Sequence, residues 1–151
     1  WAPSDIIFKF ESTYVDTLSD DPLLSPSSWQ NGVGVEMPWN IGSTTMTTIL
    51  QVYYGKNERA PDNLVSSTGR LFDRAAILAA RWSLSSDANL LASFLYDYEG
   101  GAHYSHIAYD IKLTDALKAE ISADLIEGDP DTFLGTYTKN DRACLKLSYL
   151  W

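Results

Sequence analysis

The chain has 151 residues, enough for one domain, of which 45% are hydrophobic and 21% charged. This composition excludes a disordered acidic tail, and a net charge of −9 without a cluster of Lys and Arg excludes a nucleic-acid-binding surface. No apolar run approaches the roughly 18 residues of a membrane helix, so only strands could cross a membrane. The chain begins without Met or a signal peptide, and we expect a processed mature form or a piece of a longer protein.

Alternation of apolar and polar residues with a period of two predicts β-strands along the chain. The predicted strands are residues 5–17, 29–37, 44–56, 73–84, 89–98, 104–113, 117–125 and 141–151. The alternation is strict in the seventh segment, whose polar residues would spread around a helix because every second residue steps about 200° around its axis. In the fourth segment the second face carries Ala75, Ile77 and Ala79, so an Ala-rich helix is an alternative there.

The predicted connections are short at one end of the strands and mostly long at the other end. Residues 38–43, 85–88 and 114–116 form short connections that contain turn-forming residues. The alternate connections, 18–28, 57–72 and 127–140, are longer, and only 99–103 is short on that side. This asymmetry is typical of up-and-down outer-membrane barrels, in which the short turns are periplasmic. We therefore expect both ends of the chain at the periplasmic rim.

Aromatic residues of the apolar faces fall at both ends of the predicted strands. Tyr14, Tyr54, Tyr96 and Tyr98 lie near the long connections, whereas Trp82, Tyr149 and Trp151 lie near the short turns, with Trp39 in a turn itself. The strand centres carry Phe8, Leu50, Val52, Leu78, Phe94, Ile107 and Ile121. Two aromatic belts around an aliphatic band are expected at membrane interfaces, whereas a soluble ligand-binding barrel turns its apolar face inward. The pattern predicts a transmembrane antiparallel up-and-down β-barrel, with eight strands in this chain.

The final strand has its apolar residues at every second position. These residues are Ala143, Leu145, Leu147, Tyr149 and Trp151. An aromatic last residue, a second aromatic two positions earlier and alternating apolar positions before them resemble the C-terminal assembly signal of bacterial outer-membrane barrels. The resemblance implies insertion from the periplasm by the barrel-assembly machinery. A half-buried strand that ends a soluble β-protein is the alternative.

A second stretch precedes this strand, Gly128-Asp-Pro-Asp-Thr-Phe-Leu-Gly-Thr-Tyr-Thr-Lys-Asn-Asp-Arg142. It resembles the last loop and closing strand of the large porin-like barrels of Gram-negative bacteria, the group around alginate-export-type porins. There a Gly/Asp loop with a Thr-Phe-x-Gly element precedes an Asn-Asp-Arg entry into the strand. The likeness covers only this loop and the last strand. It implies that the chain is the C-terminal half of a larger barrel, and a complete small barrel is the alternative.

Polar residues on the opposite faces of the predicted strands are expected to point into the lumen. They are Lys9, Glu11, Glu36, Gln51, Arg81, Asp97, His106, Asp110, Lys112, Lys118, Glu120, Asp124, Arg142 and Lys146. Both signs of charge occur in similar number. In a closed eight-stranded barrel these residues would fill the interior as ion pairs, whereas in a barrel of about 16 strands they would line an aqueous channel.

No catalytic site, metal site or cofactor is predicted. His106 and Asp110 share a face but lie four residues apart, roughly 13 Å at ~3.3 Å per residue, which is too far for a base and its orienting carboxylate. Two histidines and Cys144 do not make a metal site, and no nucleophile-elbow, zinc-protease or P-loop motif occurs. We therefore expect no enzyme, with a barrel hydrolase that lacks a recognisable motif as the alternative, and Cys144 receives no role.

Basic residues around the third connection suggest one more partner. Lys56, Arg59, Arg70 and Arg74 suit contacts with lipopolysaccharide phosphates. Ordinary solvated loop charges are the preferred interpretation, because four basic residues spread over nineteen positions are a weak cluster. The leading expectation is a porin-like channel or export barrel in the bacterial outer membrane, which passes small polar solutes passively. A small closed barrel with a structural or adhesive role and a soluble ligand-binding barrel are the two alternatives.

Overall fold

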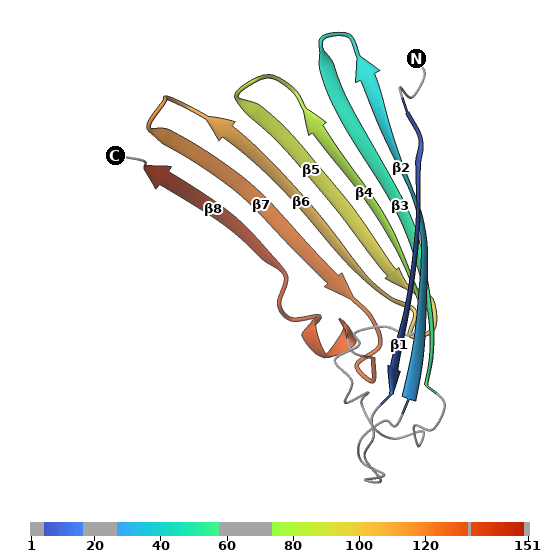
Figure 1. The fold of residues 1–151 in the computed structure, drawn as a ribbon. Coiled ribbons are helices and arrows are strands. Elements are labelled where there is room, and N and C mark those ends of the chain that lie inside the picture. The colour runs from blue at the N-terminus through green and yellow to red at the C-terminus, as the bar shows by residue number, and fades with distance from the viewer. Residues whose placement is uncertain (1–4, 17–26, 58–73, 133, 150–151) are drawn as a thin grey trace.

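Eight strands form one antiparallel sheet, in which each strand pairs with the next along the chain (Figure 1). The computed structural model describes residues 5–16, 27–57, 74–132 and 134–149. The strands are β1 (Ile7–Asp16), β2 (Ser27–Ile41), β3 (Thr44–Asn57), β4 (Arg74–Ser83), β5 (Ala88–Asp97), β6 (Ala102–Lys112), β7 (Leu117–Glu127) and β8 (Arg142–Tyr149). The prediction of an all-β, up-and-down antiparallel arrangement is confirmed, and the Ala-rich fourth segment is a strand.

The sheet is curved but not closed. In the part of the chain that the structure describes, β1 pairs only with β2 and β8 pairs only with β7. The outer edges of β1 and β8 lie apart on the two sides of the curve (Figure 1). The closed eight-stranded barrel that the sequence allows is therefore not formed by these strands alone.

The strand ends agree with the predicted asymmetry of the connections. The start of β1, the end of β8 and the short turns β2–β3, β4–β5 and β6–β7 lie at one end of the sheet, which we call the turn end (Figure 1). The β5–β6 turn and the β7–β8 connection lie at the opposite end, which we call the loop end. The predicted connections 18–28 and 57–72 fall almost wholly on residues 17–26 and 58–73, outside the described residues.

β2 is longer than predicted, because it continues through Pro38 and Trp39 to Ile41. Proline is tolerated here because β1 pairs with β2 only as far as Glu36, which leaves β2 an edge strand on that side beyond this point. The placement of Trp39 in a turn was wrong, since its indole nitrogen donates to Thr48 Oγ1 of β3 at 2.9 Å. The actual turn is the tight one between Ile41 and Thr44, where Gly42 supplies a φ of 64°.

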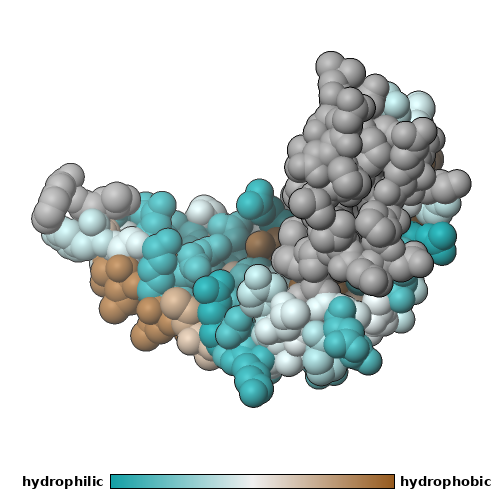
Figure 2. Space-filling view, turned by 90° about the horizontal axis from the view of Figure 1, so that it is seen from below, coloured by the Kyte–Doolittle hydropathy of each residue, from teal (hydrophilic) through white to brown (hydrophobic). Residues whose placement is uncertain are grey.

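The strand register places mainly apolar side chains on one face and most of the charged side chains on the other, which in β3, β4 and β5 also carries Ile49, Ile77, Leu91 and Leu95. The apolar side chains of each strand pair with those of its neighbour, as in Phe10 with Val33 and Leu78 with Phe94. They form the convex face, which includes Phe8, Val33, Leu50, Leu78, Phe94, Ile107, Ile121 and Leu145. Seen end-on, hydrophobic atoms lie on the outside of the curve near one edge of the sheet, and hydrophilic atoms lie on its inside and on other parts of its outer rim (Figure 2).

The β7–β8 connection is packed against the ends of β6 and β7. It contains one turn of 3-10 helix, η1 (Leu134–Tyr137), in which Leu134 and Gly135 are buried. Thr132 ties the loop together, because its hydroxyl donates to the Asp129 carbonyl at 2.7 Å and accepts from the Gly135 N–H at 3.0 Å. A Cβ on Gly135 would lie 1.6 Å from that carbonyl oxygen, so no larger residue fits without a shift of the backbone.

We predict that Gly135→Ala opens this loop and increases trypsin cleavage after Lys139 several-fold, because local opening exposes the backbone to protease. The measurement is limited proteolysis of the folded protein followed by mass spectrometry of the fragments. Asp131→Ala is the control, since that side chain is exposed in the same loop and should leave the cleavage rate unchanged. Equal cleavage of all three proteins would contradict the packed loop.

Candidate functional site

The concave face of the sheet gathers the polar residues that the sequence singled out. The register places all of them on this one face: Lys9, Glu11, Glu36, Gln51, Arg81, Asp97, His106, Asp110, Lys112, Lys118, Glu120, Asp124, Arg142 and Lys146. Because neighbouring strands bring their side chains opposite one another, many of these charges meet across the strands. The concave face is therefore the candidate functional surface, and its contacts differ between the two ends.

Asp124 of β7 is the centre of a network at the loop end. Its side chain is buried, with a relative exposure of 3% for the residue. One carboxylate oxygen accepts from the Tyr104 hydroxyl at 2.5 Å and contacts His106 Nδ1 at 2.7 Å. The other oxygen accepts from Arg142 Nε at 2.5 Å. The network therefore ties β6, β7 and β8 together through one carboxylate.

The pairing of His106 with Asp124 was missed from the sequence, which compared His106 only with Asp110 on the same strand. Counting outward from the short β6–β7 turn pairs His106 directly with Asp124 on the neighbouring strand. Tyr104 was missed as well, because a Tyr on a predicted polar face was not counted as polar. The turn position was therefore the signal that could have identified this cluster.

Asp97 has a local role that the sequence did not indicate. The residue is buried at 8% exposure at the end of β5. Its Oδ1 accepts from the backbone N–H groups of Glu99 at 3.1 Å and Gly100 at 3.2 Å, so it stabilises the β5–β6 turn. Asp97 shares the concave face with the other residues, but its Oδ1 is bound by backbone N–H groups of the β5–β6 turn.

Near the other edge of the sheet, Lys9 of β1 and Glu36 of β2 form an ion pair at 2.5 Å. Glu11 lies two residues further along β1, on the same face, and lines a hollow of about 280 Å³ together with Gln51 and Tyr53. Arg81 of β4 is exposed and lies opposite Leu91 and Thr47. On this part of the concave face, charged side chains therefore lie next to apolar ones.

At the turn end the concave face of β6, β7 and β8 forms a hollow of about 350 Å³. The hollow extends to the β4–β5 turn, and its charged lining consists of Asp87, Asp110, Lys112, Lys118, Glu120 and Lys146. Lys112 Nζ donates to Asp115 Oδ1 at 2.6 Å, and Lys146 Nζ lies 3.9 Å from Glu120 Oε2. We call this site the turn-end hollow.

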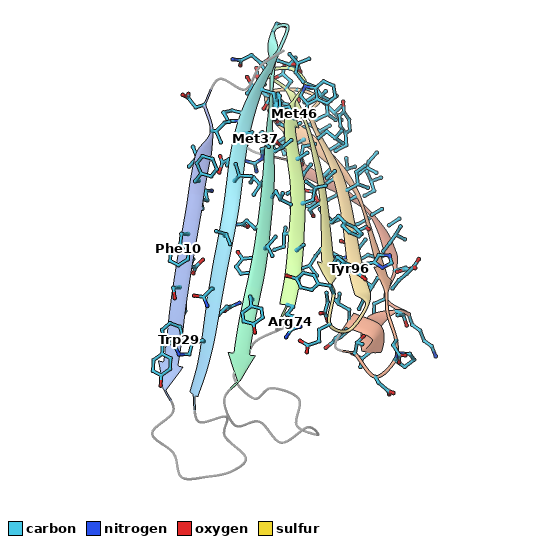
Figure 3. All side chains as sticks on the ribbon, turned by 90° about the vertical axis from the view of Figure 1, so that its right-hand side faces the viewer. Phe10, Trp29, Met37, Met46, Arg74 and Tyr96 are labelled. Atoms are coloured by element: carbon cyan, nitrogen blue, oxygen red, sulfur yellow. The ribbon has the colours of Figure 1, made fainter. Side chains whose placement is uncertain are left out.

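Aromatic side chains lie at both ends of the convex face. Figure 3 shows Trp29, Arg74 and Tyr96 towards the loop end, Met37 and Met46 towards the turn end, and Phe10 between them. The Tyr14 and Trp29 rings lie 5.2 Å apart, as do the Arg74 guanidinium and the Tyr54 ring, and Tyr96 lies 6.4 Å from Tyr98. At the turn end Trp82 donates to Thr44 Oγ1 at 3.0 Å, and Tyr149 is exposed.

The predicted assembly residues lie along the convex face of the edge strand β8. Leu145, Leu147 and Tyr149 are 63–67% exposed there and alternate with Lys146 and Ser148 of the concave face. Ala143 shares the convex face, and Trp151 lies outside the described residues. Cys144 is exposed and points to the concave face between Arg142 and Lys146.

The basic residues proposed for lipopolysaccharide contacts are described only in part. The side chain of Lys56 and the whole of Arg59 and Arg70 lie outside the described residues. Arg74 is exposed at the loop end of the convex face, and its guanidinium lies over the Tyr54 ring.

The described residues were also compared with the requirements of metal sites and membrane-spanning helices, and the chain with known proteins. Within the described ranges, His, Cys, Asp and Glu side chains form no group of three that could hold a metal ion. The same residues contain no helix that is long and apolar enough to span a membrane. Comparison with known proteins found no matching family model, no similar curated protein and no similar solved structure.

We predict that Asp124→Asn lowers the free energy of unfolding by about 1–3 kcal/mol, because Arg142 and His106 lose their buried carboxylate. Urea unfolding in detergent micelles, followed by tryptophan fluorescence, measures the change. Glu127→Gln is the matched control: Glu127 pairs with His103 at 3.6 Å, but its side chain is 74% exposed. An exposed pair contributes about 0–1 kcal/mol, so equal losses in both variants would contradict the proposed network.

Proposed function

We propose that these strands are part of a porin-like channel or export barrel in the outer membrane of a Gram-negative bacterium, through which small polar solutes pass passively. The observation that carries the proposal is the division of one curved sheet into a convex face of mainly apolar side chains and a concave face that holds most of the charged ones, with apolar side chains among them in β3, β4 and β5. In a transmembrane barrel the convex face meets lipid and the concave face meets the aqueous lumen. No step of this function requires a catalytic group or a cofactor.

The exposed apolar side chains support a lipid environment for the convex face. Phe8 is 82% exposed and Phe10 is 74% exposed, and large hydrophobic residues are exposed on the convex face of every strand. Removing apolar surface from water stabilises a protein by about 25 cal/mol per Å². A soluble ligand-binding barrel would gain this by turning its apolar face to the inside, whereas here the apolar face is on the outside of the curve.

The aromatic residues support the same orientation. Tyr, Trp and Arg side chains at the loop end and Trp and Tyr at the turn end border a band of aliphatic and Phe side chains. Such rings prefer the headgroup regions of a bilayer, because one part of the ring is apolar and the other forms hydrogen bonds. In this orientation the loop end faces lipopolysaccharide and the turn end faces the periplasm.

The open edges favour a larger barrel over the small closed one. An unpaired strand edge cannot lie in lipid, because its N–H and C=O groups have no water to bind. Further strands must therefore pair with β1 and β8 before the sheet can enter a membrane. β1 runs from the turn end to the loop end and β8 runs back, so an even number of added strands closes the barrel with antiparallel pairs throughout.

The resemblance of residues 128–142 to the last loop of large porin-like barrels agrees with this assignment, as does the likeness of β8 to an outer-membrane assembly signal. With about 16 strands the concave residues would border water instead of filling the interior. The remaining strands of the barrel, the bilayer, lipopolysaccharide and the barrel-assembly machinery are then the partners of this chain.

We expect Leu147→Asp to reduce membrane assembly at least about tenfold, because a carboxylate on the lipid-facing side is costly. Lys146→Ser, one residue away on the concave face, should leave assembly unchanged. The measurement is the amount of heat-modifiable, folded protein in outer-membrane fractions. Similar losses in both variants would argue against the assignment of the two faces.

Conductance tests directly whether the proposed lumen is open to ions. The full-length protein in a planar bilayer should give discrete conductance steps in KCl, because a polar lumen wider than that of an eight-stranded barrel admits hydrated ions. A flat current trace from correctly folded protein would rule out the channel and leave a structural or adhesive barrel as the explanation.

A further inference from the structure

The turn-end hollow has an unusual order of charges. On the concave face of β6 and β7, Asp110 lies directly opposite Glu120, and two residues further along Lys112 lies directly opposite Lys118. Two acidic residues thus face each other, and two basic residues face each other beside them. The same four residues line the hollow.

This order is not explained by the pairing of β6 with β7. Like charges directly opposite one another on a sheet are destabilising, whereas opposite charges are favourable. Exchanging Glu120 with Lys118 would turn both β6–β7 pairs into favourable ones, but it would place a lysine opposite Lys146 of β8. Glu120 therefore has a favourable partner on β8, whereas the pairing of Lys112 with Lys118 has no such compensation across the strands. Departures from such local rules are expected at functional sites.

The ion pairs of the hollow compensate only half of these charges. Lys112 is held by Asp115 of the turn at 2.6 Å, and Glu120 has Lys146 of β8 at 3.9 Å. Asp110 and Lys118 are exposed, and neither forms an ion pair within the part of the chain that the structure describes. Asp87 of the β4–β5 turn, which also lines the hollow, is likewise exposed and has no ion pair among the described residues. Two acidic groups and one basic group therefore remain available in the hollow.

We propose that the turn-end hollow binds a zwitterionic solute, whose ammonium group lies between Asp110 and Glu120 and whose carboxylate lies between Lys112 and Lys118. Positions two apart on a strand are separated by about 7 Å, so the two charges of the solute are separated by about the same distance. This inference rests on the proposed channel, for which it specifies the class of solute. Its place at the turn end is the periplasmic mouth in the proposed orientation.

A solute with a single charge fits this site less well. An anion would neutralise the Lys112–Lys118 pair but leave Asp110 and Glu120 facing each other, and a cation would do the reverse. Specificity of this kind arises because the wrong ligand leaves buried or opposed charges without compensation. The hollow, with a volume of about 350 Å³, also has room for the short chain between the two charges.

The test is isothermal titration calorimetry of the full-length protein in detergent micelles at low ionic strength, where charge interactions are least screened. The probe is 6-aminohexanoate, and hexanoate and hexylammonium are single-charge controls. We expect 6-aminohexanoate to bind at least tenfold more tightly than either control. Equal affinity for the three compounds, or no binding of 6-aminohexanoate, would overturn the proposal.

Two variants locate the site. Lys118→Gln and Asp110→Asn should each weaken 6-aminohexanoate binding about tenfold, the effect of losing about 1.4 kcal/mol from a charge-assisted hydrogen bond. Lys139→Gln is the control for Lys118→Gln, because it removes a positive charge in the exposed part of the β7–β8 connection at the opposite end of the sheet. It should not alter the affinity for 6-aminohexanoate. Unchanged affinity in both hollow variants would place any binding elsewhere and refute the assignment.

Conductance and binding measured on the same protein samples distinguish a failure of the zwitterion site from a failure of the channel. Conductance in KCl without specific binding of 6-aminohexanoate would support the channel and refute the zwitterion site. Specific binding without conductance would support the site and refute the channel.

Discussion

The register of the strands is the constraint on which the other features depend. Short turns join β2 to β3, β4 to β5 and β6 to β7, and each turn fixes which residues lie opposite one another. Since side chains alternate between the faces, a slip of one residue would exchange the apolar and polar faces of a strand. The convex band, the Asp124 network and the turn-end hollow all exist only in this register.

The strands and their faces could be predicted from the sequence because both depend on a local period of two. The alternation in residues 117–125 was sufficient to reject a helix, and β7 has that register. The full length of β2 could not be predicted, because Pro38 is tolerated only where β2 extends beyond Ile7, the first residue of β1. The tolerance of proline at this position depends on how β1 pairs with β2, and the residue pattern along β2 alone does not show that pairing.

The candidate sites were predictable only as a list of residues on one face. Which of them meet depends on partners that are distant in sequence, as for Asp124 with Tyr104, His106 and Arg142. Whether the sheet closes could not be predicted from the sequence either, because eight alternating strands are compatible with a closed barrel and with an open part of a larger one. In the described sheet β1 and β8 do not pair with each other, so these strands do not close on one another.

The packed β7–β8 connection has a consequence for what the protein presents at its loop end. Leu134 and Gly135 are buried, and Thr132, Asp129 and Gly135 are linked by hydrogen bonds, so the chain there keeps one shape. In the proposed orientation this loop faces the outside of the cell. An antibody raised against the folded loop would recognise a conformational epitope on intact cells, and would lose it when the protein is boiled in detergent.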